Sequence, residues 1–203
     1  MSNRPELNQL FRKIGMLAPQ GYAAGLHIRF AAPLIAVNTY DPAWAEKYTV
    51  NSYAMRDPMV AWGLSQEGVI RWSGIDLPDP ANIWGQAAEY GLTYGAAVSC
   101  GPMTSRSIVG AARTDREFTD VELGEIQQVV LLLHRLSEPP TELTPAQIEA
   151  LRCIADGDRH AAAAAKLGIS ESALKARLIS VRTRLMARTT SEAIQRAKEY
   201  RLL

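Results

Sequence analysis

Basic side chains concentrate in one short segment near the end of this 203-residue chain. Residues 171–188 hold one acid, Glu171, and five cations, which are Lys175, Arg177, Arg182, Arg184 and Arg188. Cations at helical spacing can contact the phosphates on both sides of a nucleic-acid groove, while shorter side chains reach the base edges. The alternative interpretation is a solvated basic face on an ordinary helical domain.

Four helices are expected to hold this segment. Thr144-Pro145 begins the first helix, and Gly157 ends it. The second helix covers residues 160–167, a turn follows at Gly168, and Ser170 caps the third helix. The third helix has an apolar stripe for the core, and a fourth runs from residue 191 to about 201; the stripe consists of Leu174, Leu178, Val181 and Leu185. A short helix, a glycine turn and a longer helix predict a helix-turn-helix.

The charge of the chain differs between its two parts. Residues 1–140 contain 11 Lys and Arg against 14 Asp and Glu, whereas residues 141–203 contain 11 against 7. Such a basic short domain is suited to nucleic acid. Residues 137–142 include Pro139-Pro140, which cannot continue a helix, and they are interpreted as a linker between domains 1–136 and 143–203.

The first 136 residues alternate amphipathic helices with short strands. Helices are expected over 5–18, from Asp41-Pro42, from Asp57-Pro58 to about 66, over 81–89 and over 119–136; strands are expected over 22–29, 34–39, 69–72, 96–100 and 108–113. This pattern predicts an α+β fold, an α-β-α sandwich, followed by an all-α four-helix domain.

Several classes of function are disfavoured by the composition. The longest apolar runs are too short to span a membrane, and the N-terminus lacks the apolar core of a secretory signal. The two cysteines, Cys100 and Cys153, lie far apart and predict neither a disulfide framework nor a zinc cluster. We therefore expect a cytoplasmic protein. His27, His134 and His160 form no catalytic or metal-binding spacing, so we also expect no enzymatic activity, metal or cofactor.

The C-terminal domain resembles the DNA-binding domain of LuxR-type regulators. The match runs from Leu143-Thr-Pro through Ile154-Ala-Asp-Gly157 and Leu167-Gly-Ile-Ser170 to Arg184-Leu185, with no gap. The resemblance implies that the third helix binds double-stranded DNA and that the fourth forms a dimer. The implied DNA-binding residues are Ser170, Ser172, Lys175, Ala176, Arg177, Ile179, Arg182 and Arg184. Lys175 and Arg182 would contact phosphates, and Ser172, Ala176 and Ile179 would lie near bases.

The N-terminal domain resembles the autoinducer-binding half of the quorum-sensing LuxR-type proteins. The family spacing is met by Trp44, Asp57-Pro58 and Trp72, with Leu92-Thr-Tyr-Gly95 before a strand. The resemblance implies an N-acyl homoserine lactone or an analogue as ligand. Its candidate binding residues are Tyr40, Trp44, Tyr48, Asp57, Trp72 and Arg113.

The roles implied by the resemblance suit the chemistry of such a ligand. The Asp57 carboxylate can accept from the ligand amide N–H, and the Trp44 indole N–H can donate to the lactone carbonyl. Tyr40 would donate to the acyl carbonyl, and Trp72 would pack on the ring. Two alternatives stay open: Asp57 could merely cap a helix, and Tyr48 could be an ordinary core residue.

Two departures from the family pattern affect the predictions. Arg113 stands where the family often has a small hydroxyl residue, and an inward Arg113 would occupy tail space, which favours a short-chain or modified ligand. Ala161–Ala165 replaces a second helix that usually carries polar residues. The predicted protein is therefore a ligand-responsive regulator that binds an inverted-repeat promoter site as a homodimer. The alternative is a ligand-independent regulator, or an antagonist that forms heterodimers with a related protein.

Overall fold

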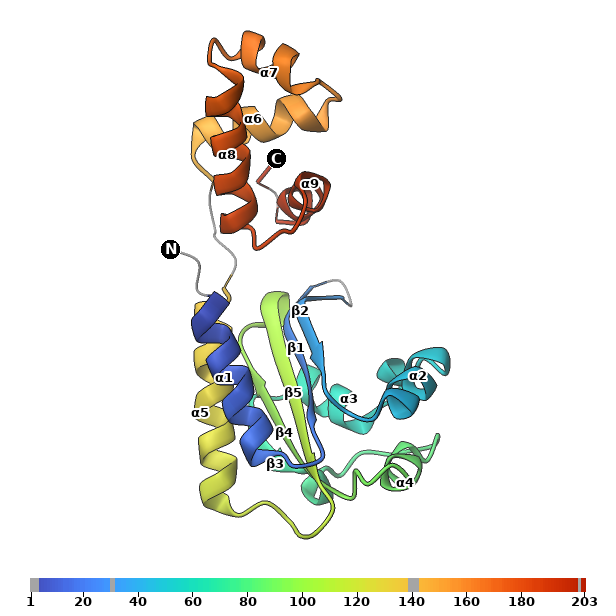
Figure 1. Ribbon diagram of the computed structural model, residues 1–203. Coiled ribbons are helices and arrows are strands. Elements are labelled where there is room, and N and C mark those ends of the chain that lie inside the picture. Colours follow the sequence, from blue (N-terminus) through green and yellow to red (C-terminus); the bar gives the residue numbers. More distant parts are fainter. Residues whose placement is uncertain (1–3, 30–31, 139–142, 201) are drawn as a thin grey trace. The chain divides into compact units, whose positions relative to one another are not determined.

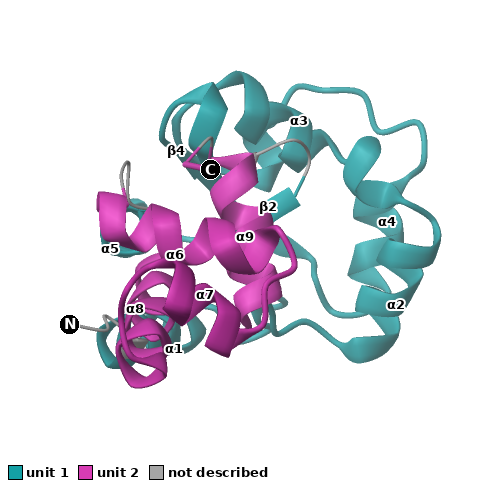
Figure 2. Cartoon of the chain, turned by 90° about the horizontal axis from the view of Figure 1, so that it is seen from above, with its two compact units in different colours: residues 1, 3–138 teal, residues 2, 139–203 magenta. Residues whose placement is uncertain are grey.

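The computed structural model describes residues 4–29, 32–138, 143–200 and 202–203. The chain divides into two compact units, coloured separately in Figure 2, whose described parts are residues 4–138 and the residues from 143 onward. Most of the predicted linker, residues 139–142, lies outside the described residues. Ser137, which was expected to begin that linker, is fully buried in the first unit, where its hydroxyl donates to the Leu133 carbonyl.

A five-stranded antiparallel sheet forms the centre of the first unit. Its order is β2-β1-β5-β4-β3, so the strands at the two edges are β2 and β3. The bounds are Tyr22–Arg29 for β1, Ala32–Asn38 for β2, Gly68–Arg71 for β3, Tyr94–Cys100 for β4 and Arg106–Arg113 for β5. The five strands predicted from alternating apolar residues are all present, with ends that differ by a few residues.

Helices lie on both sides of this sheet, as Figure 1 shows. One side is covered by α1 (Arg4–Leu17) and α5 (Asp120–Leu136), while α2 (Pro42–Val50), α3 (Pro58–Ser65) and α4 (Ile83–Ala88) lie on the other. The predicted α+β class is confirmed. The capping box expected at Thr119 and Glu122 is formed and starts α5.

The two faces of β5 differ because side chains alternate along a strand. Val109 and Ala111 point into the main core, which they share with Val98 of β4 and the buried side of α5. Ala112 joins a separate aromatic cluster on the other face, where Gly110 lies beneath Met59 of α3. The second face therefore combines very small strand residues with bulky side chains from the helices and loops above it.

Arg113 lies on the α5 side of the sheet, and the prediction that it enters the ligand site is wrong. The β4–β5 register continues without a shift from Cys100↔Ser107 to Tyr94↔Arg113, so no irregularity at Gly110 reverses the strand. Arg113 follows the alternation of Val109 and Ala111. Its guanidinium donates to Asp115 at 2.7 Å and to Glu122 at 2.9 Å.

In the described part of the second unit, four helices surround a separate apolar core. They are α6 (Pro145–Ala155), α7 (His160–Lys166), α8 (Glu171–Arg184) and α9 (Thr190–Glu199). Thr144 and Gln147 form a capping box at the start of α6. Gly168 has a φ of +62° in the turn between α7 and α8, a conformation that favours glycine. The core residues include Leu151, Ala163, Leu174, Leu178, Val181, Leu185 and Ala193.

The placement of Arg113 predicts a defect in stability rather than in ligand choice. Arg113→Ala should lower the free energy of unfolding by about 1–3 kcal/mol, because the carboxylates of Asp115 and Glu122 lose a charged hydrogen-bond donor. Hydrogen bonds from Arg116 first, and also from Arg113, hold the pKa of Glu122 below its usual value. Stability from this carboxylate is present above its ordinary pKa and is lost as the pH falls. The gap between wild type and variant in urea denaturation should therefore be wider at pH 7 than at pH 4. An altered ligand preference at unchanged stability would contradict this placement.

Candidate functional site

Five of the six predicted ligand residues lie together on one side of the sheet. Trp44 is buried in a cluster with Tyr53, Ile83, Ala87, Leu92 and Ala112, against which Tyr40, Tyr48 and Trp72 pack. Asp57 joins this group through a hydrogen bond from Tyr48. Tyr40 lies in the loop before α2, Trp44 and Tyr48 lie in α2, Asp57 precedes α3, and Trp72 begins a 3-10 helix after β3. Chain folding thus brings together positions separated by up to 32 residues, as from Tyr40 to Trp72.

Asp57 is a buried acid with both carboxylate oxygens engaged. Its Oδ1 accepts from the Met59 backbone N–H at 2.7 Å, which caps α3, and its Oδ2 accepts from the Tyr48 hydroxyl at 2.7 Å. The side chain belongs to a residue that is only 5% exposed, and this burial raises the pKa of Asp57. A carboxylate oxygen has two lone pairs, so each can accept one further N–H. The capping role is thus present, and it leaves capacity for a ligand.

Aromatic rings surround Trp44. The ring centroid of Trp44 lies 5.8 Å from that of Tyr48, 5.5 Å from Tyr90 and 6.1 Å from Tyr53, in edge-on or tilted arrangements. Such geometries are favourable for aromatic pairs. The Tyr53 hydroxyl donates to Gln86 of α4 at 2.9 Å, and this hydrogen bond connects the aromatic cluster to α4. Burial, followed by the charge of Asp57, raises the pKa of Tyr48, so its hydroxyl remains a proton donor at neutral pH.

Tyr40 and Trp72 differ in what their polar atoms offer. The Tyr40 hydroxyl donates to the Gly110 carbonyl of β5 at 2.8 Å, so this donor is in use within the protein. The Trp72 indole nitrogen is buried and has no hydrogen-bond partner among the described residues. A buried N–H without a partner is costly, and an acceptor brought by a ligand would relieve that cost. Trp72 can therefore do more than pack on a ring.

Glycines make room for this arrangement. A Cβ on Gly95 would lie 1.9 Å from the Trp72 ring, and a Cβ on Gly110 would lie 2.6 Å from the Met59 sulfur. The ring of Trp72 also packs against that of Trp84 in a tilted arrangement, with ring centroids 4.9 Å apart. The sequence interpretation did not assign Met59, Trp84 or Gly110 to the site. Glycine inside a strand is the signal that could have revealed the close approach of another group.

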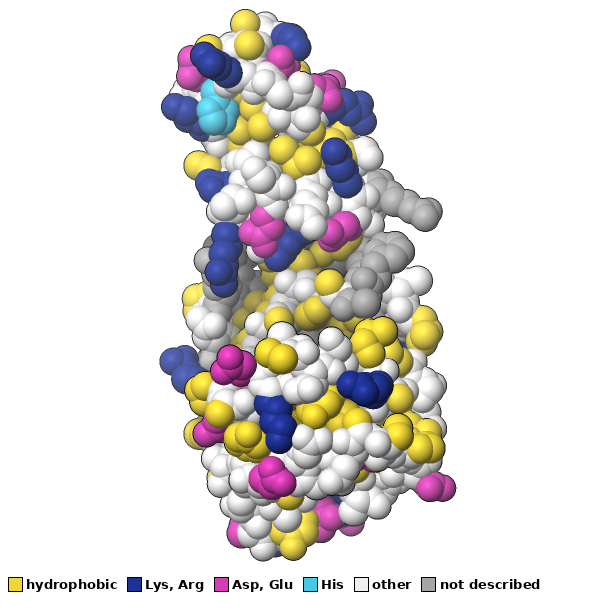
Figure 3. All heavy atoms as spheres, turned by 90° about the vertical axis from the view of Figure 1, so that its right-hand side faces the viewer, with side chains coloured by type: hydrophobic (Ala, Val, Ile, Leu, Met, Phe, Trp, Pro, Cys, Tyr) yellow, Lys and Arg dark blue, Asp and Glu magenta, His cyan; other side chains and the backbone are white. Residues whose placement is uncertain are grey.

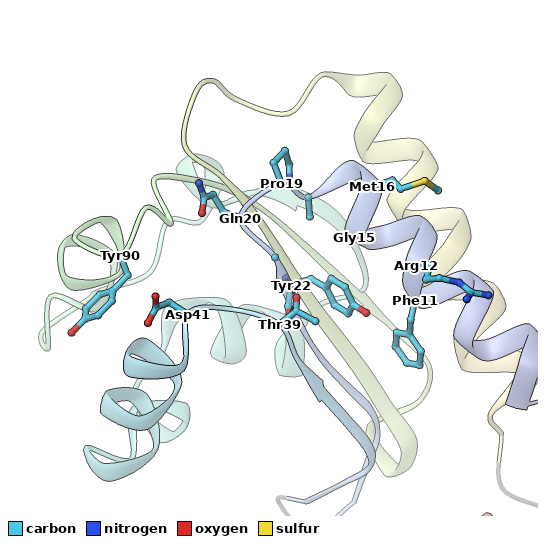
Figure 4. Close-up of a pocket in the computed structure, with 12 residues that line it drawn as sticks. Phe11, Arg12, Gly15, Met16, Pro19, Gln20, Tyr22, Thr39, Asp41 and Tyr90 are labelled. Carbon is cyan, nitrogen blue, oxygen red and sulfur yellow. Dashed lines mark hydrogen bonds between the residues drawn. The ribbon is translucent and has the colours of Figure 1, made fainter.

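A separate groove of about 760 Å³ lies between α1 and the loops that follow α1, β2 and α4. Figure 4 shows Phe11, Arg12 and Met16 of α1 on one side of it and Asp41 and Tyr90 on the other. Tyr22 and Thr39 lie between them, and Tyr22 stacks on Phe11 with ring centroids 6.1 Å apart. None of the predicted ligand residues lines this groove, although Tyr90 also packs on Trp44 in the aromatic cluster.

In the second unit, α8 presents one face to its core and another to solvent. Four of the predicted DNA-binding residues are exposed at spacings of three, one and three residues along the helix: Ser172, Lys175, Ala176 and Ile179. They lie opposite Leu174, Leu178 and Val181, which are buried. Ile179 is 52% exposed and lies in this stripe.

The remaining predicted DNA-binding residues occupy more varied positions. Arg184 is exposed, Arg177 is half-buried beside the core face, and Ser170 caps α8 by accepting from the Ala173 N–H. Arg182 is also half-buried and donates weakly to the Arg188 carbonyl at 3.3 Å, while its Nε is buried without a partner among the described residues. Lys175 and Arg184 are thus the freest cations on the helix.

The surface and the described helices add two observations. Figure 3 shows a face of the molecule on which Lys and Arg side chains mix with acidic and apolar ones. Among the described helices, not one combines the length and apolar character required to cross a bilayer. The described residues also contain no group of three or more His, Cys, Asp or Glu arranged to hold a metal ion, and Cys100 and Cys153 are not paired with each other.

The first unit matches a known family. A family profile described as "Autoinducer binding domain" covers residues 20–138, which is more than half of the chain. The chain therefore belongs to the autoinducer-binding-domain family of LuxR-type quorum-sensing regulators.

Curated relatives agree with this family. The HTH-type quorum-sensing regulator RhlR of Pseudomonas aeruginosa is 28% identical over 180 residues, which cover 80% of this chain and 75% of that protein. The transcriptional activator protein SolR of Ralstonia solanacearum is 28% identical over 137 residues, covering 64% of this chain and 57% of that one. The relatives are regulators of transcription and not enzymes by their descriptions.

Solved structures share the fold. A crystal structure of SdiA from Escherichia coli aligns with a TM-score of 0.54 at 19% identity, covering 97% of this chain and 91% of that one. The N-acylhomoserine lactone dependent LuxR family factor CepR2 from Burkholderia cenocepacia aligns with a TM-score of 0.51 at 18% identity, covering 64% and 79%.

The burial of Asp57 predicts how stability depends on pH. The pKa of Asp57 is raised in the folded state. Its contribution to the free energy of unfolding is therefore fully present below the ordinary pKa of about 3.9, and it is lost as the pH rises through the raised value. Asp57→Asn keeps an oxygen to cap α3 and cannot ionise. The unfolding free energy of this variant, relative to wild type, should therefore increase between pH 4 and pH 7 in urea titrations. Tyr48→Phe is the matched control, because it removes the partner hydroxyl and leaves the acid. A relative stability that falls over this range would contradict the assignment.

Proposed function

We propose that this chain is a ligand-responsive transcription regulator that binds an N-acyl homoserine lactone or a related small molecule and, as a dimer, an inverted-repeat site in DNA. The observation that carries the proposal is the buried Asp57–Tyr48 pair beside Trp44, within the domain that defines the family. A buried acid is costly in an apolar cluster unless hydrogen bonds compensate it, and such residues mark functional sites.

The chemistry of the site supports an acylated amide as ligand. An amide N–H needs an acceptor, which Asp57 supplies, and two carbonyl groups need donors. Trp72 Nε1 is an unused donor, and Tyr40 can supply a second if its hydroxyl leaves the Gly110 carbonyl. Trp44 is a third source of an N–H. The surrounding rings supply the apolar contact area that small-molecule sites require.

The exposed stripe of α8 supports DNA as the second partner. Lys175 and Arg184 are free to contact phosphates, and Ser172, Ala176 and Ile179 provide short or apolar side chains for base edges and thymine methyl groups. Two such helices in a symmetric dimer would contact two half-sites about one helical turn apart.

A second candidate function rests on α7. Its exposed residues Ala161, Ala162 and Ala165 carry no polar group, Lys166 is held by Asp158 at 2.6 Å, and His160 at its start is the remaining exposed polar side chain. This helix therefore offers few phosphate contacts of its own. A regulator with weak DNA affinity could act instead by forming inactive heterodimers with a related protein, or it could act without ligand.

Ligand binding should stabilise the protein. Hexanoyl-homoserine lactone at a hundredfold excess over its Kd should raise the free energy of unfolding by about 2.7 kcal/mol, because it binds only the folded state. Asp57→Asn should weaken binding at least tenfold in calorimetry, since the ligand amide loses its acceptor. Val109→Ala, which changes the opposite face of the sheet, is the control and should retain the affinity. Equal binding by wild type and Asp57→Asn would remove Asp57 from the site.

DNA binding should depend on α8 and on salt. Fluorescence anisotropy with an inverted-repeat duplex at two salt concentrations should give an affinity that falls as salt rises. Lys175→Ala should weaken binding to all sequences alike and reduce the salt slope by about one. Arg152→Ala removes an exposed charge from α6 and serves as the control. An affinity that does not change with salt, or a Lys175→Ala variant equal to the control, would contradict the proposal and favour the heterodimer function.

A further inference from the structure

Helix α3 packs against β5 through two reciprocal contacts. Met59 of α3 lies over Gly110, where a Cβ would come within 2.6 Å of the Met59 sulfur. Four residues further along the helix, Gly63 lies over Ile108, whose side-chain carbons would be 2.8–3.0 Å from a Cβ on that glycine. A large residue on each element thus meets a glycine on the other.

The spacing of the two contacts is nearly the same along α3 and along β5. Four residues of α-helix advance about 6 Å, and two residues of an antiparallel strand advance about 6.8 Å. The side chains at 59 and 63 therefore match those at 110 and 108, on one face of each element. Ser99 of β4, paired with Ile108 in the sheet, donates its hydroxyl to the Gly63 carbonyl at 2.6 Å. Helix α3 is therefore held directly against β4 and β5, and no further layer of side chains fits between the helix and these strands.

This packed interface begins at the polar site. Asp57 caps the first turn of α3, and the Tyr40 hydroxyl bonds the carbonyl of Gly110. The Met59–Gly110 contact is the first layer beyond these groups, and the Gly63–Ile108 contact is the second. On the other sides, the site is bounded by the rings of Trp44 and its aromatic neighbours and by Trp72, which lies directly on Gly95.

We propose, building on the proposed function, that this site accepts short acyl chains, up to hexanoyl, and that Met59 and Ile108 set the limit. A longer chain attached at the polar end would have to separate α3 from β5, breaking the Ser99–Gly63 hydrogen bond and both reciprocal contacts. Shortening either large side chain opens the interface in line with the acyl group, because neither glycine partner can fill the space. Arg113 has no part in this limit, since it lies on the opposite face of the sheet.

The test compares the acyl-chain preference of three proteins by thermal shift and calorimetry. Butanoyl-, hexanoyl-, octanoyl- and dodecanoyl-homoserine lactone are titrated into wild type, Ile108→Ala and Val109→Ala. Val109 is the next residue of β5 and is also buried, but it faces the α5 core. Wild type should be stabilised by the two shorter lactones. Ile108→Ala should gain at least tenfold in dodecanoyl affinity, and Val109→Ala should keep the wild-type order. Ile108→Val and Met59→Ala serve if Ile108→Ala does not fold.

The outcomes separate this proposal from the function on which it rests. Wild type that binds dodecanoyl-homoserine lactone as tightly as the hexanoyl compound would overturn the length limit and leave the lactone function intact. The same is true if the preference shifts equally in the Ile108 and Val109 variants. Failure of every lactone to bind any of the proteins would instead overturn the lactone function, and the length limit with it.

Discussion

The burial of one carboxylate organises the first unit. Asp57 is nearly inaccessible, and no Lys or Arg of the described residues forms an ion pair with it; its carboxylate accepts from the Met59 N–H and the Tyr48 hydroxyl. The bond from Met59 lies within the start of α3, and the bond from Tyr48 connects this start to α2. The rest of the site follows from this connection, because α2 then carries Trp44 into the aromatic cluster, and α3 is directed along β5.

The face of the sheet beneath α3 and Trp72 carries very small side chains at the points of contact, which lets these groups approach the strands. Gly95, Gly110 and Ala112 present little or nothing above the backbone on this face. That allows Trp72 and Met59 to lie directly on the strands. On the opposite face, the same strands carry Val98, Val109 and Ala111, which pack against α5 in the manner of an ordinary core. A single sheet thus combines a stable, apolar face with one that is adapted to a small and partly polar site.

In the second unit, one helix, α8, has a face buried in the core and a face exposed to solvent. Leu174, Leu178 and Val181 hold α8 in the core, and the stripe that begins at Ser172 remains exposed. Helical periodicity separates the buried face from the exposed one without any change in the backbone. Because α7 is composed almost wholly of alanine, it packs closely through Ala163 and Ala164 but contributes little to the outer surface.

Local sequence patterns determined much of this protein. Alternation and 3.6-residue periodicity predicted the strands and helices, and Thr119, Thr144 and Ser170 marked the starts of α5, α6 and α8, because capping acts within a few residues. The resemblance to the autoinducer-binding family, carried by the spacing of Trp44, Asp57 and Trp72, implied a common site, and these residues do lie together with Tyr40 and Tyr48. The face on which Arg113 lies was decided by the unbroken register of β4 and β5, which single-strand alternation around a glycine could not establish. The pairing of Met59 with Gly110 and of Ile108 with Gly63 was likewise decided only by the tertiary structure, since it depends on how a helix and a distant strand meet in space.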